Sequence, residues 1–269
     1  MKRARLLAFL TLAACSALCG QQATEATLPI AARWVAVGPL GHLYLVGDDN
    51  SIGKYAADGS LIVRWSGNRQ GLAERIDASN PQRILVWFAD FRKAAFLDRN
   101  LTPMGELDLI AAGYPETRAI AQARDGNLWI FDEPAGLLRK ITPEGAELLR
   151  SQPLNQLLDR RVAFDLLTER DNLLIAFDPD IGIAVFDIFG QFQYTCAARG
   201  AAAVHLGKEG ISWIGPDGRL HTRPLRPTPR PPDPHPLFPA DKAPPRVFLF
   251  DQGWIAAHPD RIEVRRWAP

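Results

Sequence analysis

The stretch ARDGNLWIFDEPAGLLRKITPEG, residues 123–145, has the pattern of a β-hairpin. An Asp-Gly turn leads into the apolar and aromatic run NLWIF, the turn DEP follows that run, and a second apolar run ends at the turn PEG. Asp, Gly and Pro favour tight turns because they tolerate or preset the backbone angles that turns require. The stretch therefore predicts two short antiparallel strands joined by a tight turn.

The first apolar run of this stretch recurs at near-constant spacing through the chain. Each copy is flanked by further short strand-like runs with Gly or Pro turns, which leaves room for four strands per unit. A period of roughly 40–45 residues with several short strands per unit is typical of a β-propeller. We therefore predict an all-β fold, a six-bladed β-propeller with four antiparallel strands per blade. The copies begin at His42, Arg83, Asn127, Asn172, Ile211 and Gly253, and successive starts are 41, 44, 45, 39 and 42 residues apart.

The last unit contains only three clear strand-like runs, RVFLF, GWIAA and RIEVRRW. We expect the segment TEATLPI, residues 24–30, to supply its fourth strand. Such a strand would tie the N-terminal part of the chain to the last blade and close the ring without exposed sheet edges.

A proline-rich segment, residues 224–245, holds ten prolines in 22 residues. Proline has no backbone donor, so we expect this insertion to stay out of the sheets and to run as polyproline II or as a loose excursion. It is either a connector between the last two blades or a partner-binding arm. In the second case the binding residues would be Arg226, Arg230, Leu237 and Phe238.

The composition limits the class of partner. The chain has 269 residues, of which 47% are apolar, and 31 basic residues balance 30 acidic ones. This is enough apolar material for a large core, and we assign residues 21–269 to one propeller domain. The balanced charge excludes the electrostatic footprint of a nucleic-acid partner or of an anionic membrane surface.

The first 20 residues have the pattern of a secretory signal. Lys2, Arg3 and Arg5 precede the apolar run 6–14, which is too short to span a bilayer of about 30 Å. The sequence LAAC ending at Cys15 resembles a bacterial lipobox, in which that cysteine is lipidated; the alternative is ordinary cleavage near Cys19. Either way we expect an exported protein, periplasmic or associated with the outer membrane, with no transmembrane span.

Two periodic sets of side chains have both a structural and a functional interpretation. Acidic residues follow the second strand of nearly every unit. They either form tight turns or make up a ring of carboxylates that binds a metal or a basic partner. Aromatic residues recur within those strands, as packing between blades or as stacking platforms for a sugar. We favour the structural interpretation of both sets. The acids include Asp48, Asp49, Asp90, Asp132, Glu133, Asp178, Asp180, Asp217 and Asp260, and the aromatics are Tyr44, Trp87, Trp129, Trp213 and Trp254.

No catalytic motif is present in the sequence. The five histidines form no HExxH pair, and neither Gly-x-Ser-x-Gly nor a glycine-rich phosphate loop occurs. Cys196 lies in the strand-like run QYTC, where we expect a buried, inert thiol. We therefore assign no catalytic residue and no cofactor.

The runs DGNLWIF and KYAADGSL resemble the repeats of NHL-type and virginiamycin-lyase-like propellers. A more extended similarity, through ILVWFADFRKAAFLDRNL and VFDIFGQF, is to exported six-bladed propellers of Bacteroidetes-type bacteria. The resemblance implies export and six blades but carries over no residue roles. Six-bladed lactonases hold calcium in the central channel with Glu, Asn and Asp side chains. Under that alternative the candidates here are Glu169, Asp165 and Asn172.

These observations predict a non-catalytic, extracytoplasmic propeller that acts as a protein-interaction scaffold. Its expected partner is an envelope or outer-membrane protein, and outside that complex we expect a monomer. The alternatives are a lactonase-like, metal-dependent hydrolase that uses calcium and a carbohydrate-binding propeller.

Overall fold

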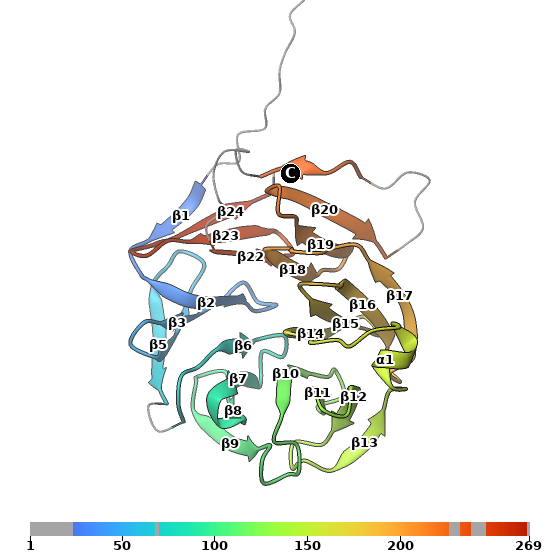
Figure 1. Cartoon of the computed structure of the whole chain (residues 1–269). Helices are drawn as coiled ribbons and strands as arrows, with labels where there is room; N and C mark the ends of the chain where they lie inside the picture. Colours follow the sequence, from blue (N-terminus) through green and yellow to red (C-terminus); the bar gives the residue numbers. More distant parts are fainter. Residues whose placement is uncertain (1–23, 68–69, 226–231, 238–245, 268–269) are drawn as a thin grey trace, which may run out of the picture.

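The computed structural model describes residues 24–67, 70–225, 232–237 and 246–267, and it confirms the predicted six-bladed propeller. Six four-stranded antiparallel sheets stand around a central axis (Figure 1). Consecutive blades contact one another, mainly through their innermost strands, and β22 (Arg246–Phe250) of blade 6 contacts β2 (Ala32–Val37) of blade 1. The ring is therefore closed.

Blades 1 to 3 follow the chain directly from the inner strand to the outer strand. In blade 3 the quoted hairpin signal becomes β11 and β12, as predicted. A short 3₁₀ helix, η1 (Ala89–Phe91), connects the second and third strands of blade 2. From inner to outer, the strands are β2, β3 (Leu43–Gly47), β4 (Ser51–Tyr55) and β5 (Leu61–Ser66) in blade 1; β6 (Arg75–Asp77), β7 (Ile84–Phe88), β8 (Lys93–Leu97) and β9 (Pro103–Asp108) in blade 2; and β10 (Thr117–Gln122), β11 (Leu128–Asp132), β12 (Leu137–Ile141) and β13 (Glu147–Arg150) in blade 3.

Blades 4 and 5 repeat this order, and blade 6 borrows its outer strand from the beginning of the described chain. The helix α1 (Leu154–Leu157) lies outside the ring between blades 3 and 4 (Figure 1). The strands are β14 (Leu166–Arg170), β15 (Leu173–Asp178), β16 (Gly182–Asp187) and β17 (Phe192–Cys196) in blade 4; β18 (Ala203–Leu206), β19 (Gly210–Ile214), β20 (Arg219–Pro224) and β21 (His235–Pro236) in blade 5; and β22, β23 (Gly253–Ala257), β24 (Ile262–Arg266) and β1 (Thr24–Leu28) in blade 6.

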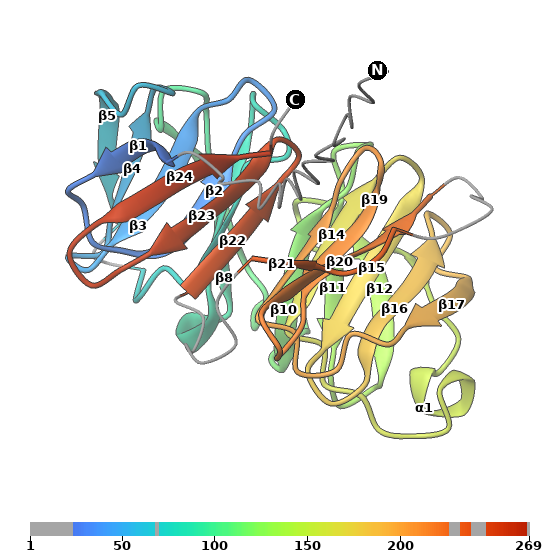
Figure 2. The ribbon, with the colours of Figure 1, turned by 90° about the horizontal axis from the view of Figure 1, so that it is seen from above.

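The predicted closure is confirmed. β1 pairs antiparallel with β24, and Leu28 lies opposite Ile262 in the register. Figure 2 shows β1 beside β24 at the edge of blade 6. Leu28 and Ile262 are buried in the core cluster between blades 6 and 1. The N-terminal strand therefore adds both hydrogen bonds and apolar packing to the last blade.

The predicted packing role of the periodic aromatics is confirmed for four of the five. Tyr44, Trp87, Trp129 and Trp254 are almost completely buried. Burial of such large rings between blades contributes strongly to the hydrophobic stabilisation. Trp213 is different, because it is half-buried and stacks on His221 with ring centroids 5.2 Å apart.

The expectation that the proline-rich segment joins no sheet is wrong at two points. Pro224 is the last residue of β20 and lies opposite Gly210 of β19. His235 and Pro236 form β21, which pairs with β20 as the outer strand of blade 5. Proline is tolerated there because an outer strand needs no donor on its solvent side. Leu237 is half-buried and packs against the core cluster that contains Trp254, and its backbone N–H donates to Gly218 O at 3.1 Å.

Candidate functional site

A cavity of about 1080 Å³ runs along the axis of the ring. All six blades contribute to its wall, mainly through their innermost strands, and blade 3 contributes least. Basic and acidic side chains alternate around it with apolar ones. The charged and aromatic groups that matter below are Trp34, Arg75, Asp165, Arg170, His205, Phe248 and Asp251.

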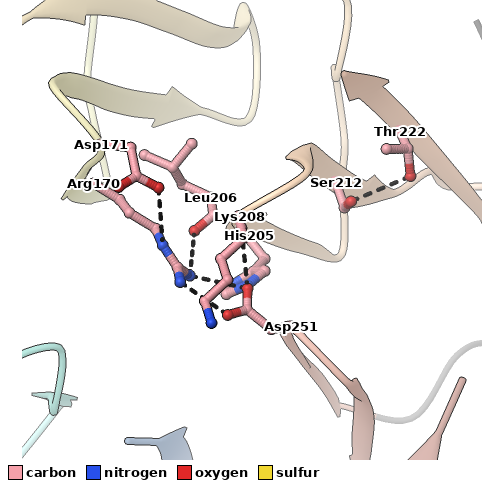
Figure 3. Close-up of polar contacts among 8 residues, drawn as sticks. All are labelled: Arg170, Asp171, His205, Leu206, Lys208, Ser212, Thr222 and Asp251. Atoms are coloured by element: carbon pink, nitrogen blue, oxygen red, sulfur yellow. Dashed lines mark hydrogen bonds and ion pairs between the residues drawn. The ribbon is translucent and has the colours of Figure 1, made fainter. Parts of the chain in front are cut away.

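One polar network connects three consecutive blades at the channel. Arg170 ends the inner strand of blade 4, His205 lies in that of blade 5, and Asp251 follows that of blade 6. Arg170 binds Asp251 through two parallel bonds, Nη1 to Oδ1 and Nη2 to Oδ2, each 2.9 Å long. His205 Nε2 is 3.1 Å from the same Oδ1. Figure 3 shows both side chains converging on Asp251, with the backbone of Lys208 donating to it from the side.

This network holds Asp251 as a carboxylate. Burial alone would raise the pKa of Asp251, but the hydrogen bonds from His205 and Arg170, together with their charges, outweigh it and place the pKa well below its usual value. A carboxylate that is this fully engaged orients its neighbours and does not serve as a proton acceptor near neutral pH. The arrangement therefore fixes blades 4, 5 and 6 relative to one another.

A second group in the channel combines one cation with two aromatic rings. Arg75 begins β6, and its guanidinium carbon lies 4.7 Å from the centroid of the Trp34 ring. Trp34 in turn contacts Phe248 edge to face, with ring centroids 5.1 Å apart. The only hydrogen bond of the Arg75 side chain within the described residues joins Nη1 to the backbone oxygen of Asp165 at 2.5 Å. Burial lowers the pKa of Arg75, whose Nε has no partner there.

The residues named for a calcium site do not converge. Glu169 is buried, and its carboxylate accepts hydrogen bonds from Trp129 Nε1 at 2.6 Å and from the backbone N–H of Arg124 at 2.7 Å. Asp165 is bound by Arg118, whose Nε and Nη2 lie 2.8 and 2.7 Å from Oδ1. Asn172 is exposed in the β14–β15 turn with a φ of 66°. Each side chain thus has a separate structural position.

The acids that close the second strands mainly stabilise their own turns. Asp49 accepts from the backbone N–H of Ser51, and Asp178 accepts from that of Asp180. Within the described residues, no group of three or more His, Cys, Asp and Glu side chains is arranged to hold a metal ion. The turn interpretation is confirmed for these two acids.

The outer surface carries a feature that the sequence analysis missed. In blades 1, 2 and 3 the outer strand contains a β-bulge, and the extra residue in each is Ile62, Met104 or Leu148. Their exposed fractions are 50%, 62% and 52%. We call these three residues the bulge row. The equivalent bulge of blade 4 carries the exposed polar residue Gln193.

The other predicted site residues divide into two groups. Leu237 packs against the core, as described above, so it is not a free binding anchor. Cys196 is buried, as expected, and burial raises the pKa of its thiol, which disfavours the reactive thiolate. Cys15, Arg226, Arg230 and Phe238 lie outside the described residues.

Two signals could have pointed to the features that sequence reasoning missed. Arg75 and Arg170 lie in inner strands, which border the channel, so a charged side chain there is a candidate for the channel wall. Ile62, Met104 and Leu148 each follow a tight turn by two or more residues. The pairing of Arg170 with Asp251 has no local sequence signal, because the two residues are 81 positions apart.

Searches for related proteins support the fold alone. No protein-family model and no curated protein matches the chain. Among solved structures, virginiamycin B lyase from Staphylococcus aureus superposes with a TM-score of 0.62 at 12% identity, over 90% of this chain and 99% of that one. A streptogramin B lyase superposes with a TM-score of 0.62 at 11% identity, over 90% of this chain and 85% of that one. The Pan2 WD40 domain of Neurospora crassa superposes with a TM-score of 0.57 at 11% identity, over 84% of this chain and 72% of that one.

The similarity to virginiamycin B lyase confirms the propeller part of the resemblance drawn from the repeats. At such low identity it transfers no activity to this chain. Among the described residues, no helix has the length and apolarity needed to cross a membrane.

Proposed function

We propose that this propeller is a non-catalytic module that acts outside the cytoplasm as a protein-interaction scaffold in the cell envelope. The observation that carries the proposal is the bulge row. Three consecutive blades present a large apolar side chain at the same unpaired position of their outer strands. Apolar side chains grouped on an otherwise polar surface are typical of protein interaction sites.

The distribution of exposed apolar side chains supports a one-sided docking surface. Within the described residues, eight of the nine exposed large apolar side chains fall between residues 40 and 148, in blades 1 to 3 and their loops. Only Phe189, in blade 4, lies outside that part. A partner on the side of blades 1 to 3 would leave the axial channel open. The outer strands concerned, β5, β9 and β13, follow one another around the ring in Figure 1.

Bulges also explain how these outer strands can bind a partner without adding to its sheet. An open outer strand offers unpaired backbone groups to any other strand, whereas a bulge interrupts the ladder and turns the edge away. The bulge residue itself has no partner across the ladder, so its side chain is free to contact another protein. We therefore propose side-chain docking at the bulge row.

The test is a crosslinked pull-down of the full chain from envelope membranes. We expect a defined envelope protein to be recovered with the wild type and lost with the triple variant Ile62→Glu, Met104→Glu, Leu148→Glu. The matched control is Phe189→Glu, which changes an equally exposed apolar residue in blade 4 and should keep the partner. Since all four positions are exposed, each change should alter the free energy of unfolding by less than about 0.5 kcal/mol. Equal recovery by the triple variant would refute the docking surface.

Export and membrane attachment are a separate part of the proposal, based on the N-terminal sequence. If Cys15 is lipidated, Cys15→Ser should move the protein from the membrane fraction to the soluble fraction, and Cys19→Ser should not. A wild-type protein found only in the soluble periplasmic fraction would support ordinary signal cleavage. A protein retained in the cytoplasm would overturn the envelope location.

The calcium-dependent hydrolase is distinguished by its metal requirement. The scaffold proposal expects the same melting temperature in calcium and in EDTA, because the carboxylates named for that site already have protein partners or lie apart. Stabilisation by several degrees in calcium would favour the hydrolase, since a ligand that binds the native state raises its stability by mass action.

A further inference from the structure

Arg75 is a cation in the channel wall without an anionic partner. No carboxylate among the described residues lies within ion-pair distance of it. The nearest candidate, Asp165, offers Arg75 only its backbone oxygen and gives its carboxylate to Arg118. The guanidinium has five N–H donors, and the contacts described use one of them. The carboxylates of Glu74, Asp165 and Asp77 stabilise its charge from a distance, but none of them contacts it directly, so its remaining N–H donors can bind a small anion in the channel.

Other arginines near the channel show what a satisfied arginine looks like in this protein. Arg170 forms its two bonds with Asp251. Arg33 donates to the backbone oxygen of Gly47 and to Asn50 Oδ1. Arg246 also lines the channel and donates to one backbone oxygen, that of Arg33, but it is exposed to solvent. Arg75 differs from these arginines because it is less exposed and its buried Nε has no partner among the described residues.

The surroundings of Arg75 are apolar and aromatic on one side. Trp34 lies against the face of the guanidinium, and Phe248 extends this surface on the next blade. Both rings are half-buried and line the cavity. Trp34 is itself held in place, because its Nε1 donates to the backbone oxygen of Ile76 at 3.3 Å. The wall thus offers a fixed aromatic surface next to an unpaired guanidinium.

We propose that the axial channel binds a small aromatic carboxylate, with its carboxylate on Arg75 and its ring against Trp34 and Phe248. A guanidinium matches a carboxylate in plane through two parallel N–H···O bonds, and offset or edge-to-face contact suits aromatic rings. The cavity, at about 1080 Å³, has room for such a ligand and several waters. This site is independent of the docking surface proposed above.

Other ligand classes fit this wall less well. A neutral sugar would stack on the rings but would give the Arg75 guanidinium no direct anionic partner. The carboxylates of Asp77 and Glu74 also line this part of the channel, and they repel a phosphate dianion more strongly than a monoanion. A monoanion with a flat apolar body satisfies the charge and the aromatic surface together.

The test is isothermal titration calorimetry of the full chain with naphthalene-2-carboxylate, compared with the neutral naphthalene-2-carboxamide. We expect the carboxylate to bind and the amide, which has the same shape, to bind about tenfold more weakly or not at all. Arg75→Met should weaken carboxylate binding by about tenfold or more. Arg75→Lys should weaken it less, because lysine keeps the charge but cannot donate two parallel hydrogen bonds to the carboxylate.

Two variants serve as controls. Arg83 also lies over an aromatic ring, 5.2 Å from the centroid of Phe96, but its Nε and Nη2 are paired with Gln122 and Gly126. Arg83→Met should therefore leave binding unchanged, as should the triple variant of the bulge row, which excludes adventitious binding to exposed apolar side chains. If Arg75→Met fails to fold, Arg75→Lys carries the test. Absence of binding by the wild type, equal affinity for carboxylate and amide, or unchanged affinity in both Arg75 variants would overturn the proposal.

Discussion

Replacement of Glu169 by Gln tests how the blades are held together. The Glu169 side chain is only 2% exposed, and it joins blade 4 to blade 3 by accepting hydrogen bonds from Trp129 Nε1 and from the backbone N–H of Arg124. Lys140 Nζ lies 3.8 Å from the same carboxylate. A glutamine in this place loses the charge and can turn only one oxygen towards the two donors.

The expected cost follows from those two losses. Hydrogen bonds to a charged group contribute about 1.5–3 kcal/mol and neutral ones about 0.5–1.5 kcal/mol, while a buried donor without a partner costs about 1–3 kcal/mol. Together they give a decrease of roughly 2–4 kcal/mol in the free energy of unfolding for Glu169→Gln. For a domain of this size that corresponds to a decrease of roughly 5–15 °C in melting temperature.

The assay is urea unfolding followed by tryptophan fluorescence, with Glu106→Gln as the control. Glu106 is 49% exposed and contacts Gln70 and Lys93 at the surface, so its loss should cost less than about 1 kcal/mol. A midpoint shift for Glu169→Gln no larger than that for Glu106→Gln would refute the argument that this buried carboxylate joins the two blades.

Three further predictions concern the network, a turn and the closure. The ionised Asp251 has its partners in the folded state, so it should contribute stability at neutral pH that is lost as the pH falls below about 4 towards its lower folded pKa. Asp251→Asn should flatten that part of an acid-unfolding curve measured by circular dichroism. Gly182→Ala should lower stability by about 2–4 kcal/mol in denaturant titrations, since φ is +106° and a Cβ would lie 2.5 Å from the Cys196 oxygen; Gly105→Ala, with no atom within 4 Å of its Cβ, should do little. Deletion of residues 24–28 should lower the melting temperature, since blade 6 loses its outer strand; an unchanged value would contradict the described pairing.

The repeat was predictable because its signals are local. Each second strand is an apolar run bounded by Asp, Gly or Pro, and these residues act on the backbone within a few positions. The inner strand of blade 2 gives little sequence signal, because it is only three residues long, Arg75–Asp77, and carries two charges. The β21 pairing was missed because proline content argued against a strand, whereas an outer position removes the need for donors on one side.

The candidate sites were less predictable, for a different physical reason. The Arg170–Asp251 pair joins blades 4 and 6, and the Arg75–Trp34 contact joins blades 2 and 1. Both depend on how side chains are directed in the folded ring, which residue spacing alone does not report. The bulge row depends on one extra residue in a ladder, which shifts a side chain outward without changing the apolar pattern.

The pairing of β1 with β24 has a consequence for how the chain acquires its fold during synthesis or export. A chain that emerges from its N-terminus presents β1 first, but the strand that β1 pairs with lies within the last few residues, Ile262–Arg266. Blades 1 to 5 can form before β1 pairs, because their strand pairings are local in sequence. Among the described residues, the pairing of β1 with β24 is the strand pairing with the greatest separation in sequence, and until it forms the edge of β24 stays open to other chains. Completion of the ring is therefore the step at which premature aggregation and productive folding compete.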